Sequence, residues 1–377
     1  MKSLLATLPL FLTIQGFSAD CCPPATSKSK DPCPVIQKCC PKTYSCSSVL
    51  FDFYGEWLFL QPNGSNLYYA AEAFPFDASI AVPPVSPNWQ IFEIDPSYSS
   101  GFEVGTNFIF PANDMNLEVN WERMHSQDSE SMQVAPQSIG TGNMVGPIWD
   151  IGPNSANYKN ARGIGFFHFD AVNLFAGKTV CFMNNLKTRF YAGAGFIRVK
   201  QQVSSEYFNS ALTISRSVSA SSLFLGAGPE FGLDFDYRLI RGFSFTGSTS
   251  AALYMGQLQN STTFTSFTPR LNDIHVPQPN VQQTTVPNRA QLIPGFVEKL
   301  GFSYASSFNS SKWTLAAGYQ FQIYVNAVQS MDFTSPQVPP SLSPAIVPDL
   351  GVYAVGFQRT LSNYILTGPY VSLAVDF

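Results

Sequence analysis

The sequence is poor in charge, in histidine and in catalytic motifs. Charged residues make up 12% of the 377 residues, about half the ordinary share, and only 3 histidines are present. Neither a Gly-x-Ser-x-Gly elbow nor a complete Gly-x-Gly-x-x-Gly loop occurs. The net charge is −4 and basic clusters are absent, which argues against a nucleic-acid partner. We therefore expect no enzyme, no cofactor and no metal site.

Long apolar runs are also missing once the N-terminus is set aside. No later segment approaches the roughly 20 apolar residues that a membrane helix needs. Aromatic residues nevertheless reach 14%, and Phe alone occurs 33 times. A transmembrane β-barrel combines these features, because its outer face must be apolar whereas its inner face is polar.

The N-terminus has the layout of a secretory signal peptide over residues 1–19. Lys2 precedes an apolar run from Leu4 to Ile14, and Ala19 stands before the expected cleavage site. Residues 20–48 are rich in Cys and Pro, and we expect them to form a periplasmic segment. Residues 49–377 would then form the membrane domain.

Alternation with a period of two marks the candidate strands. In 221–239 one face carries Leu223 and Phe231, and the other carries Glu230 and Asp234. A half-exposed strand with lipid on one side and a wet interior on the other explains this period. Stronger or weaker versions recur in 50–60, 102–110, 115–123, 163–175, 186–200, 243–257, 295–306, 313–327, 350–358 and 370–377.

The lengths of the connections carry a second signal. Short turns at 111–114, 238–242 and 309–312 alternate with long connections at about 62–97, 126–160, 259–292 and 328–349. This asymmetry is typical of barrels with periplasmic turns and extracellular loops. The fold class is therefore all-β, a transmembrane antiparallel β-barrel of about 10–12 strands with long extracellular loops. Assigning 350–358 to a loop gives ten strands, and an unrecognised strand would give twelve.

The last strand ends in an aromatic residue. Val371, Leu373 and Val375 alternate before Phe377 at the carboxy terminus. Such an ending is typical of barrels in the bacterial outer membrane. We expect Phe377 to be the signal for the assembly machinery, and outer-membrane lipid to be the second partner.

Several segments resemble a known family. The chain is similar to the pore-forming, major-outer-membrane-protein-like family typified in Legionella and also present in chlamydia-like bacteria. The segments that carry the resemblance are 53–62, 100–105 leading to Trp121, 226–233 and 370–377. The resemblance covers most of the chain from about residue 50 onward. It implies a barrel in the bacterial outer membrane with porin activity and without catalytic residues.

The same alternation selects residues that would line a pore. Acidic residues outnumber basic ones on the inner face, which predicts mild cation selectivity. His168 and Asp170 lie two positions apart, and we interpret them as a hydrogen-bonded pair in the lumen rather than a catalytic dyad. Pairing of the inner charges across a nearly closed lumen is an open alternative. The predicted pore-lining residues are Glu103, Glu118, Glu122, His168, Asp170, Lys187, Arg189, Glu230 and Asp234.

The cysteines predict disulfide bonds, because a secreted protein meets an oxidising compartment. The candidates are Cys21, Cys22, Cys33, Cys39, Cys40, Cys46 and Cys181. We place Cys181 in the periplasmic connection 176–185, so all 7 would lie on one side of the membrane. An odd number of cysteines cannot all form disulfide bonds within one chain. A disulfide bond to a neighbouring envelope protein, an intrachain clasp and a homo-oligomer all stay open.

The favoured function is passive diffusion of small hydrophilic solutes and ions. The alternative is a disulfide-cross-linked structural envelope protein or an adhesin with little channel activity.

The cross-linking hypothesis predicts disulfide-linked species of this chain in native membranes. Electrophoresis without reductant should show bands larger than the monomer, and reductant should convert them to monomer. Monomer alone in both lanes would contradict the hypothesis.

Overall fold

The computed structural model describes residues 49–64, 66–73, 90–111, 114–133, 144–146, 160–183, 185–208, 214–240, 242–266, 280–308, 311–334 and 356–376. The expected signal peptide, the Cys/Pro-rich segment and Phe377 lie outside these residues. No helix within them is long and apolar enough to cross a membrane.

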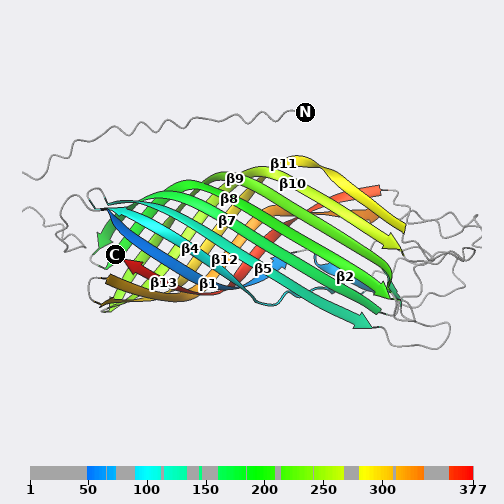
Figure 1. The fold of residues 1–377 in the computed structure, drawn as a ribbon, viewed down its shortest axis with the longest axis horizontal. Coiled ribbons are helices and arrows are strands. Elements are labelled where there is room, and N and C mark those ends of the chain that lie inside the picture. The colour runs from blue at the N-terminus through cyan, green and yellow to red at the C-terminus, as the bar shows by residue number, and fades with distance from the viewer. Residues whose placement is uncertain are drawn as a thin grey trace, which may run out of the picture.

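Ten strands form one closed antiparallel barrel (Figure 1). Each strand pairs with its neighbour in chain order, and β1 pairs with β13 to close the ring. The strands of the barrel are β1 (Leu50–Gly64), β4 (Ser99–Phe110), β5 (Met115–Gln133), β7 (Asn160–Met183), β8 (Leu186–Phe208), β9 (Ile214–Ile240), β10 (Phe243–Ser266), β11 (Asn280–Phe308), β12 (Ser311–Thr334) and β13 (Gly356–Asp376). A separate sheet holds β2 (Tyr68–Ala73), β3 (Gln90–Glu93) and β6 (Met144–Gly146).

The barrel prediction is confirmed, and the number of strands is ten. Residues 356–358 begin β13, the strand that also holds residues 370–376, and the rest of the segment 350–358 lies outside the described residues. The strands are longer than the alternation indicated. β11 has 29 residues where we expected a strand only over 295–306, and β10 extends to Ser266. Parts of the expected loops are therefore strand.

One end of the barrel collects the tight turns together with the start of β1 and the end of β13 (Figure 1). Asp114 has φ 57° and Gly242 has φ 85°, so both adopt the left-handed conformation that a tight turn requires. The amide of Thr179 donates to the carbonyl of Asp114 at 2.9 Å, and the amide of Ala305 donates to the carbonyl of Gly242 at 2.8 Å. These bonds join each turn to the neighbouring strand.

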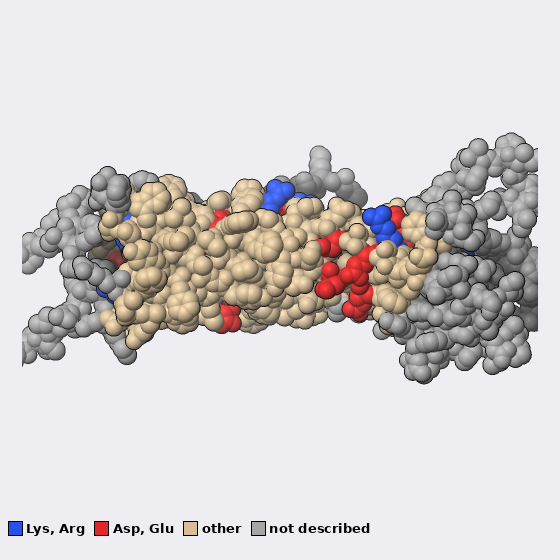
Figure 2. Space-filling model, turned by 90° about the horizontal axis from the view of Figure 1, so that it is seen from below, with Lys and Arg blue, Asp and Glu red and all other residues tan. Residues whose placement is uncertain are grey.

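The outer face nearest this end is mostly apolar, and Lys178 on β7 and Glu298 on β11 are exposed charges within it. On β8 the outward positions from Leu186 to Phe196 carry no charge, and Phe190 and Phe196 are exposed. This run matches the roughly 9–11 residues that cross a bilayer as a tilted strand. In Figure 2 most of one face of the barrel is free of charge, and charged side chains gather towards one end of the described residues.

Beyond the apolar band the polarity of the wall is reversed. Ile197 and Val199 point inward and are 0% and 1% exposed, whereas Arg198 between them points outward. On β7, Phe167 and Phe169 are likewise buried inside the barrel. The wall therefore continues past the bilayer with an apolar interior and a polar exterior.

The centre of the barrel is a packed apolar layer. The rings of Phe169 on β7 and Tyr324 on β12 have centroids 5.2 Å apart, although four strands separate β7 from β12 on either side of the ring. Tyr364 stacks on Phe169 with centroids 6.3 Å apart. Side chains from opposite walls thus meet directly and fill the lumen.

A bulge brings β12 into this layer. Tyr324 pairs with Tyr364 and Val328 pairs with Ser362, so three residues of β12 oppose one of β13. Asn326 lies in this bulge with φ 61°. Beyond the bulge the amide of Gln329 donates to Ser222 Oγ on β9 at 2.9 Å, and Asn260 Nδ2 on β10 donates to the carbonyl of Gln329 at 2.6 Å. The backbone of β12 therefore bonds to strands that are not its neighbours.

The segment around β2 occupies the end of the lumen opposite the tight turns. Tyr207 Oη on β8 donates to the carbonyl of Tyr69 at 2.5 Å, and Asn66 Nδ2 donates to Ser362 Oγ at 2.9 Å. A Cβ atom at Gly163 would lie 2.5 Å from the ring of Tyr69. Residues 66–73 belong to an expected outer loop, yet they pack against the inner wall.

Close approach of strands at Gly228 generates a stability prediction. A Cβ atom there would lie 2.0 Å from the carbonyl oxygen of Leu253, so Gly228→Ala must displace backbone. We expect a loss of about 1–3 kcal/mol in the free energy of unfolding, as for other overpacked sites. Gly55→Ala is the control, because a Cβ atom at Gly55 meets nothing within 4 Å. Urea unfolding of both variants in lipid vesicles compares their free energies of unfolding. Equal stability of the two variants would contradict the close approach of strands at Gly228.

Candidate functional site: an acidic cavity in the lumen

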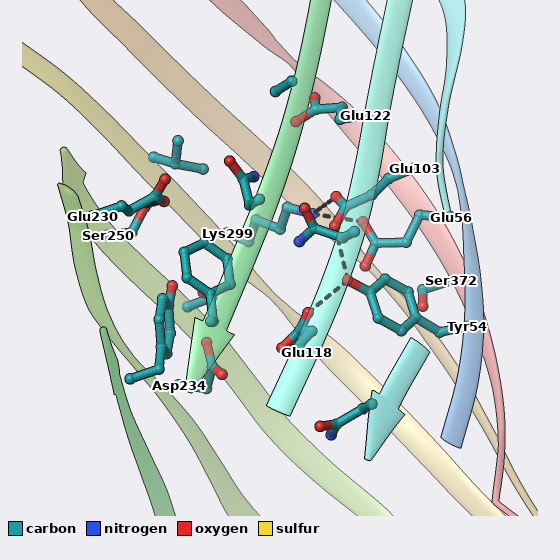
Figure 3. Close-up of a pocket in the computed structure, with 18 of the residues that line it drawn as sticks. Tyr54, Glu56, Glu103, Glu118, Glu122, Glu230, Asp234, Ser250, Lys299 and Ser372 are labelled. Carbon is teal, nitrogen blue, oxygen red and sulfur yellow. Dashed lines mark hydrogen bonds and ion pairs between the residues drawn. The ribbon is translucent and has the colours of Figure 1, made fainter. Parts of the chain in front are cut away.

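A cavity of ≈ 310 Å³ lies inside the barrel (Figure 3). It is located between the tight-turn end and the apolar layer. Its wall is formed by inward positions of the barrel strands, because alternation turns every second side chain into the lumen. At one limit it is lined by Asp52 and Ala374, and at the other by Tyr254 and Tyr324.

Acidic residues dominate the wall of this cavity. Arg189 and Lys299 are its only basic residues among the described part of the chain. The acidic residues are Asp52, Glu56, Glu103, Glu118, Glu122, Glu230 and Asp234. The excess of acids predicted for the inner face is therefore present in the cavity.

Lys299 forms the first of two ion-pair groups. Its Nζ lies 2.6 Å from Glu56 Oε2 and 2.6 Å from Glu103 Oε2 (Figure 3). Lys299 belongs to β11, whereas the two carboxylates belong to β1 and β4, which are not neighbours of β11. The ammonium group therefore ties different sides of the wall together.

Arg189 forms the second group. Its Nη1 lies 2.5 Å from Glu118 Oε2 and 2.9 Å from Asp234 Oδ2. Tyr54 joins the two groups, because its hydroxyl is 2.7 Å from Glu118 Oε1 and 3.0 Å from Glu103 Oε1. The inner charges are therefore paired, as the open alternative expected, although Arg189 and Asp234 occupy opposite positions of the adjacent strands β8 and β9 and not opposite walls.

Glu230 and Glu122 accept hydrogen bonds from uncharged side chains. Ser250 Oγ donates to Glu230 Oε1 at 2.7 Å, and Tyr254 Oη donates to Oε2 at 2.9 Å. Gln322 Nε2 on β12 donates to Glu122 Oε1 at 2.7 Å across the lumen. These hydrogen bonds fix the positions of both carboxyl groups against the cavity wall.

The cavity wall is rich in carboxylates and carries no histidine of the described residues. His125 and His168, the histidines within the described residues, do not line it. No group of three or more His, Cys, Asp or Glu side chains in the described part of the chain is arranged to hold a metal ion.

The structure places six of the predicted pore-lining residues on the cavity wall. They are Glu103, Glu118, Glu122, Arg189, Glu230 and Asp234. Lys187 is exposed near the tight turn at 185 and does not line the cavity. Tyr54 and Glu56, which the prediction omitted, share a face with Asp52, so the alternation of 50–60 could have identified them.

The predicted inward position of His168 and Asp170 is wrong. Both occupy outward positions of β7, between the buried Phe167, Phe169 and Ala171. The error has a physical cause: this part of β7 lies where the polarity of the wall is reversed. The expected pairing of the two side chains does occur, with His168 Nε2 2.5 Å from Asp170 Oδ2.

Cys181 lies within β7 rather than in a connection, and it is exposed near the tight-turn end. The other six cysteines lie outside the described residues.

The chain is similar to one protein family and, at low identity, to solved structures of outer-membrane proteins. The family described as "Legionella pneumophila major outer membrane protein precursor" matches residues 43–377. Among curated proteins none matches the chain. The outer membrane protease OmpT from Escherichia coli is 10% identical, with 88% of this chain and 98% of that chain covered and a TM-score of 0.40. A FadL homologue of Pseudomonas aeruginosa is 12% identical, with 87% and 90% covered and a TM-score of 0.28.

The ion-pair groups predict that Lys299→Met destabilises the barrel. The substitution leaves Glu56 and Glu103 close together without their cation, and we expect a loss of about 3 kcal/mol in the free energy of unfolding. Lys178→Met removes an exposed lysine from β7 and should leave stability unchanged. Urea unfolding in vesicles measures both.

A rescue variant separates charge from packing. Adding Glu103→Gln to Lys299→Met removes one of the two uncompensated carboxylates and should restore part of the lost stability. A double variant as unstable as the single one would contradict the electrostatic explanation.

Proposed function

Because the chain belongs to the family of the Legionella pneumophila major outer membrane protein, we propose that it is a structural barrel of the bacterial outer membrane. Its lumen is closed to solutes in the conformation described above.

The proposal depends on the apolar layer at the centre of the barrel. Phe169 and Tyr324 are 0% and 2% exposed and meet from opposite walls, with ring centroids 5.2 Å apart. A hydrated ion cannot pass between rings in contact, and an apolar constriction also excludes water. The layer is thick, because it includes further inward side chains that are fully buried. Among them are Leu58, Leu60, Met124, Phe167, Ile197, Phe224, Ile293 and Leu366.

The packing around β2 supports the same function. Tyr69 and Ile94 are 2% exposed and lie in the mouth opposite the tight turns. A solute that entered from that side would meet this packing before it reached the central layer.

Passive diffusion of small hydrophilic solutes is the second candidate. The acidic cavity favours it, because 7 carboxylates facing 2 basic groups would attract cations to the tight-turn end. The porin activity that the sequence resemblance implies also favours it. Conduction through this barrel requires that the side chains of the apolar layer separate.

Disulfide bonding to a neighbouring envelope protein is compatible with the structural role. Cys181 is exposed near the end of the barrel where β1 begins, and residues 20–48 directly precede β1. Because the number of cysteines in the chain is odd, at least one of the 7 has no disulfide partner within the chain.

Planar-bilayer recordings distinguish the two candidates. The structural proposal predicts that the refolded wild-type barrel is silent. Phe169→Ala combined with Tyr324→Ala removes the two rings that meet across the lumen and should produce discrete current steps. In a salt gradient the reversal potential should then indicate cation selectivity, because the cavity between the apolar layer and the tight-turn end is acidic.

A matched control removes two outward side chains from the same strands. Leu174→Ala with Phe321→Ala deletes exposed lipid-facing groups on β7 and β12 and should leave the barrel silent. Discrete steps from the folded wild-type protein would overturn the structural proposal and establish the porin.

A further inference from the structure

A cluster of charged side chains lies on the outside of the barrel, on three adjacent strands. Trp121, Val172 and Phe196 occupy paired outward positions of β5, β7 and β8. The next outward positions carry ionisable side chains on all three strands. They are Arg123, Asp170 and Arg198, followed by His125, His168 and Lys200. We call these six residues the outer basic cluster.

Asp170 lies at the centre of this cluster. Its carboxylate is 3.7 Å from Arg123 Nε, 4.0 Å from Arg198 Nη1 and 2.5 Å from His168 Nε2. The ring of His125 packs edge-on against that of His168, with centroids 5.7 Å apart. One carboxylate thus holds two guanidinium groups against the wall from either side.

Positive charge exceeds negative charge in the cluster. Arg123, Arg198 and Lys200 face a single acid, Asp170, and the outward neighbours farther along these strands are Gln127, Phe166 and Gln202. The two guanidinium side chains are 47% and 44% exposed, so most of their donors face outward. A cationic surface of this kind needs an anionic partner or water.

The position along the strand identifies that partner as a lipid. Arg198 is the first charged outward residue of β8 after the apolar run Leu186–Phe196, which is long enough to cross the bilayer. Trp121, two residues before Arg123, packs against Phe102 with centroids 5.1 Å apart. Aromatic side chains mark the edge of the bilayer, so the charged groups lie at the level of the lipid head groups.

We propose that the outer basic cluster binds the phosphate groups of a lipid in the outer leaflet. Arginine recognises phosphate with two parallel hydrogen bonds, and two guanidinium groups held on either side of Asp170 present such donors side by side. The acyl chains of the same lipid would lie on Trp121, Val172 and Phe196. The proposal is independent of whether the lumen conducts.

Lipid binding by the folded, full-length protein in detergent micelles tests the proposal. The probe is diphosphorylated lipid A, compared with the same lipid after removal of both phosphates. The wild-type protein should bind the phosphorylated form at least tenfold more tightly. Equal binding of the two forms would overturn the proposal without any variant.

Two double variants then assign the site. Arg123→Gln with Arg198→Gln keeps polar side chains at exposed positions and should weaken binding of the phosphorylated lipid at least tenfold. Lys178→Gln with Lys312→Gln removes two positive charges from exposed positions on β7 and β12 near the tight turns, and it should change the affinity less than twofold. Equal loss in both variants would mean a general charge effect and would overturn the proposal. Circular dichroism shows whether each variant keeps the strand content of the folded barrel.

Competition with inorganic phosphate separates the two sources of the anion. A lipid-binding surface should retain its lipid in millimolar inorganic phosphate, because the acyl chains contribute to affinity. Displacement of the lipid by phosphate at that concentration would assign the cluster to the free anion and overturn the lipid assignment.

Discussion

Closure of the main-chain hydrogen-bond ladder is the constraint on which the rest of the structure depends. Lipid offers no partner to backbone amides and carbonyls, so a sheet can cross a bilayer only when it has no edge. The pairing of β1 with β13, which runs from Asp52 opposite Asp376 to Gly64 opposite Tyr364, removes the last edge. Once the ring is closed, every side chain must face either outward or into the lumen, and both the acidic cavity and the outer basic cluster result from this choice.

The barrel wall meets different surroundings along its length, and its sequence pattern changes accordingly. Inside the bilayer, lipid lies outside and polar groups lie inside, as at Glu118 and Arg189. Past the bilayer the exterior is polar and the lumen is packed, as at Arg198 and Ile197. Alternation alone could therefore predict the cavity residues but not the orientation of His168 and Asp170. In β8 the change from apolar even positions to apolar odd ones after Phe196 is visible in the sequence and locates the transition.

Other features depend on the third dimension and could not be predicted from the chain. The partners of Lys299 are on β1 and β4, and the tilt and stagger of the closed barrel decide that these carboxylates lie within its reach. The bonds of β12 to β9 and β10 follow a bulge at Asn326, and the local alternation gives no sign that three residues there lie opposite one. The packing of Tyr69 against Gly163 likewise joins a predicted loop to a strand far along the chain.

The length of the strands determines how far the protein extends from the cell. On β8, residues 197–208 continue past the apolar band as regular strand. At ~3.3 Å per residue and a tilt of ~40°, they raise the rim of the barrel by roughly 30 Å above the bilayer. A rigid column of this height resists bending, so its rim keeps a fixed distance from the lipid. An antibody or a second cell would meet the rim before it met the membrane.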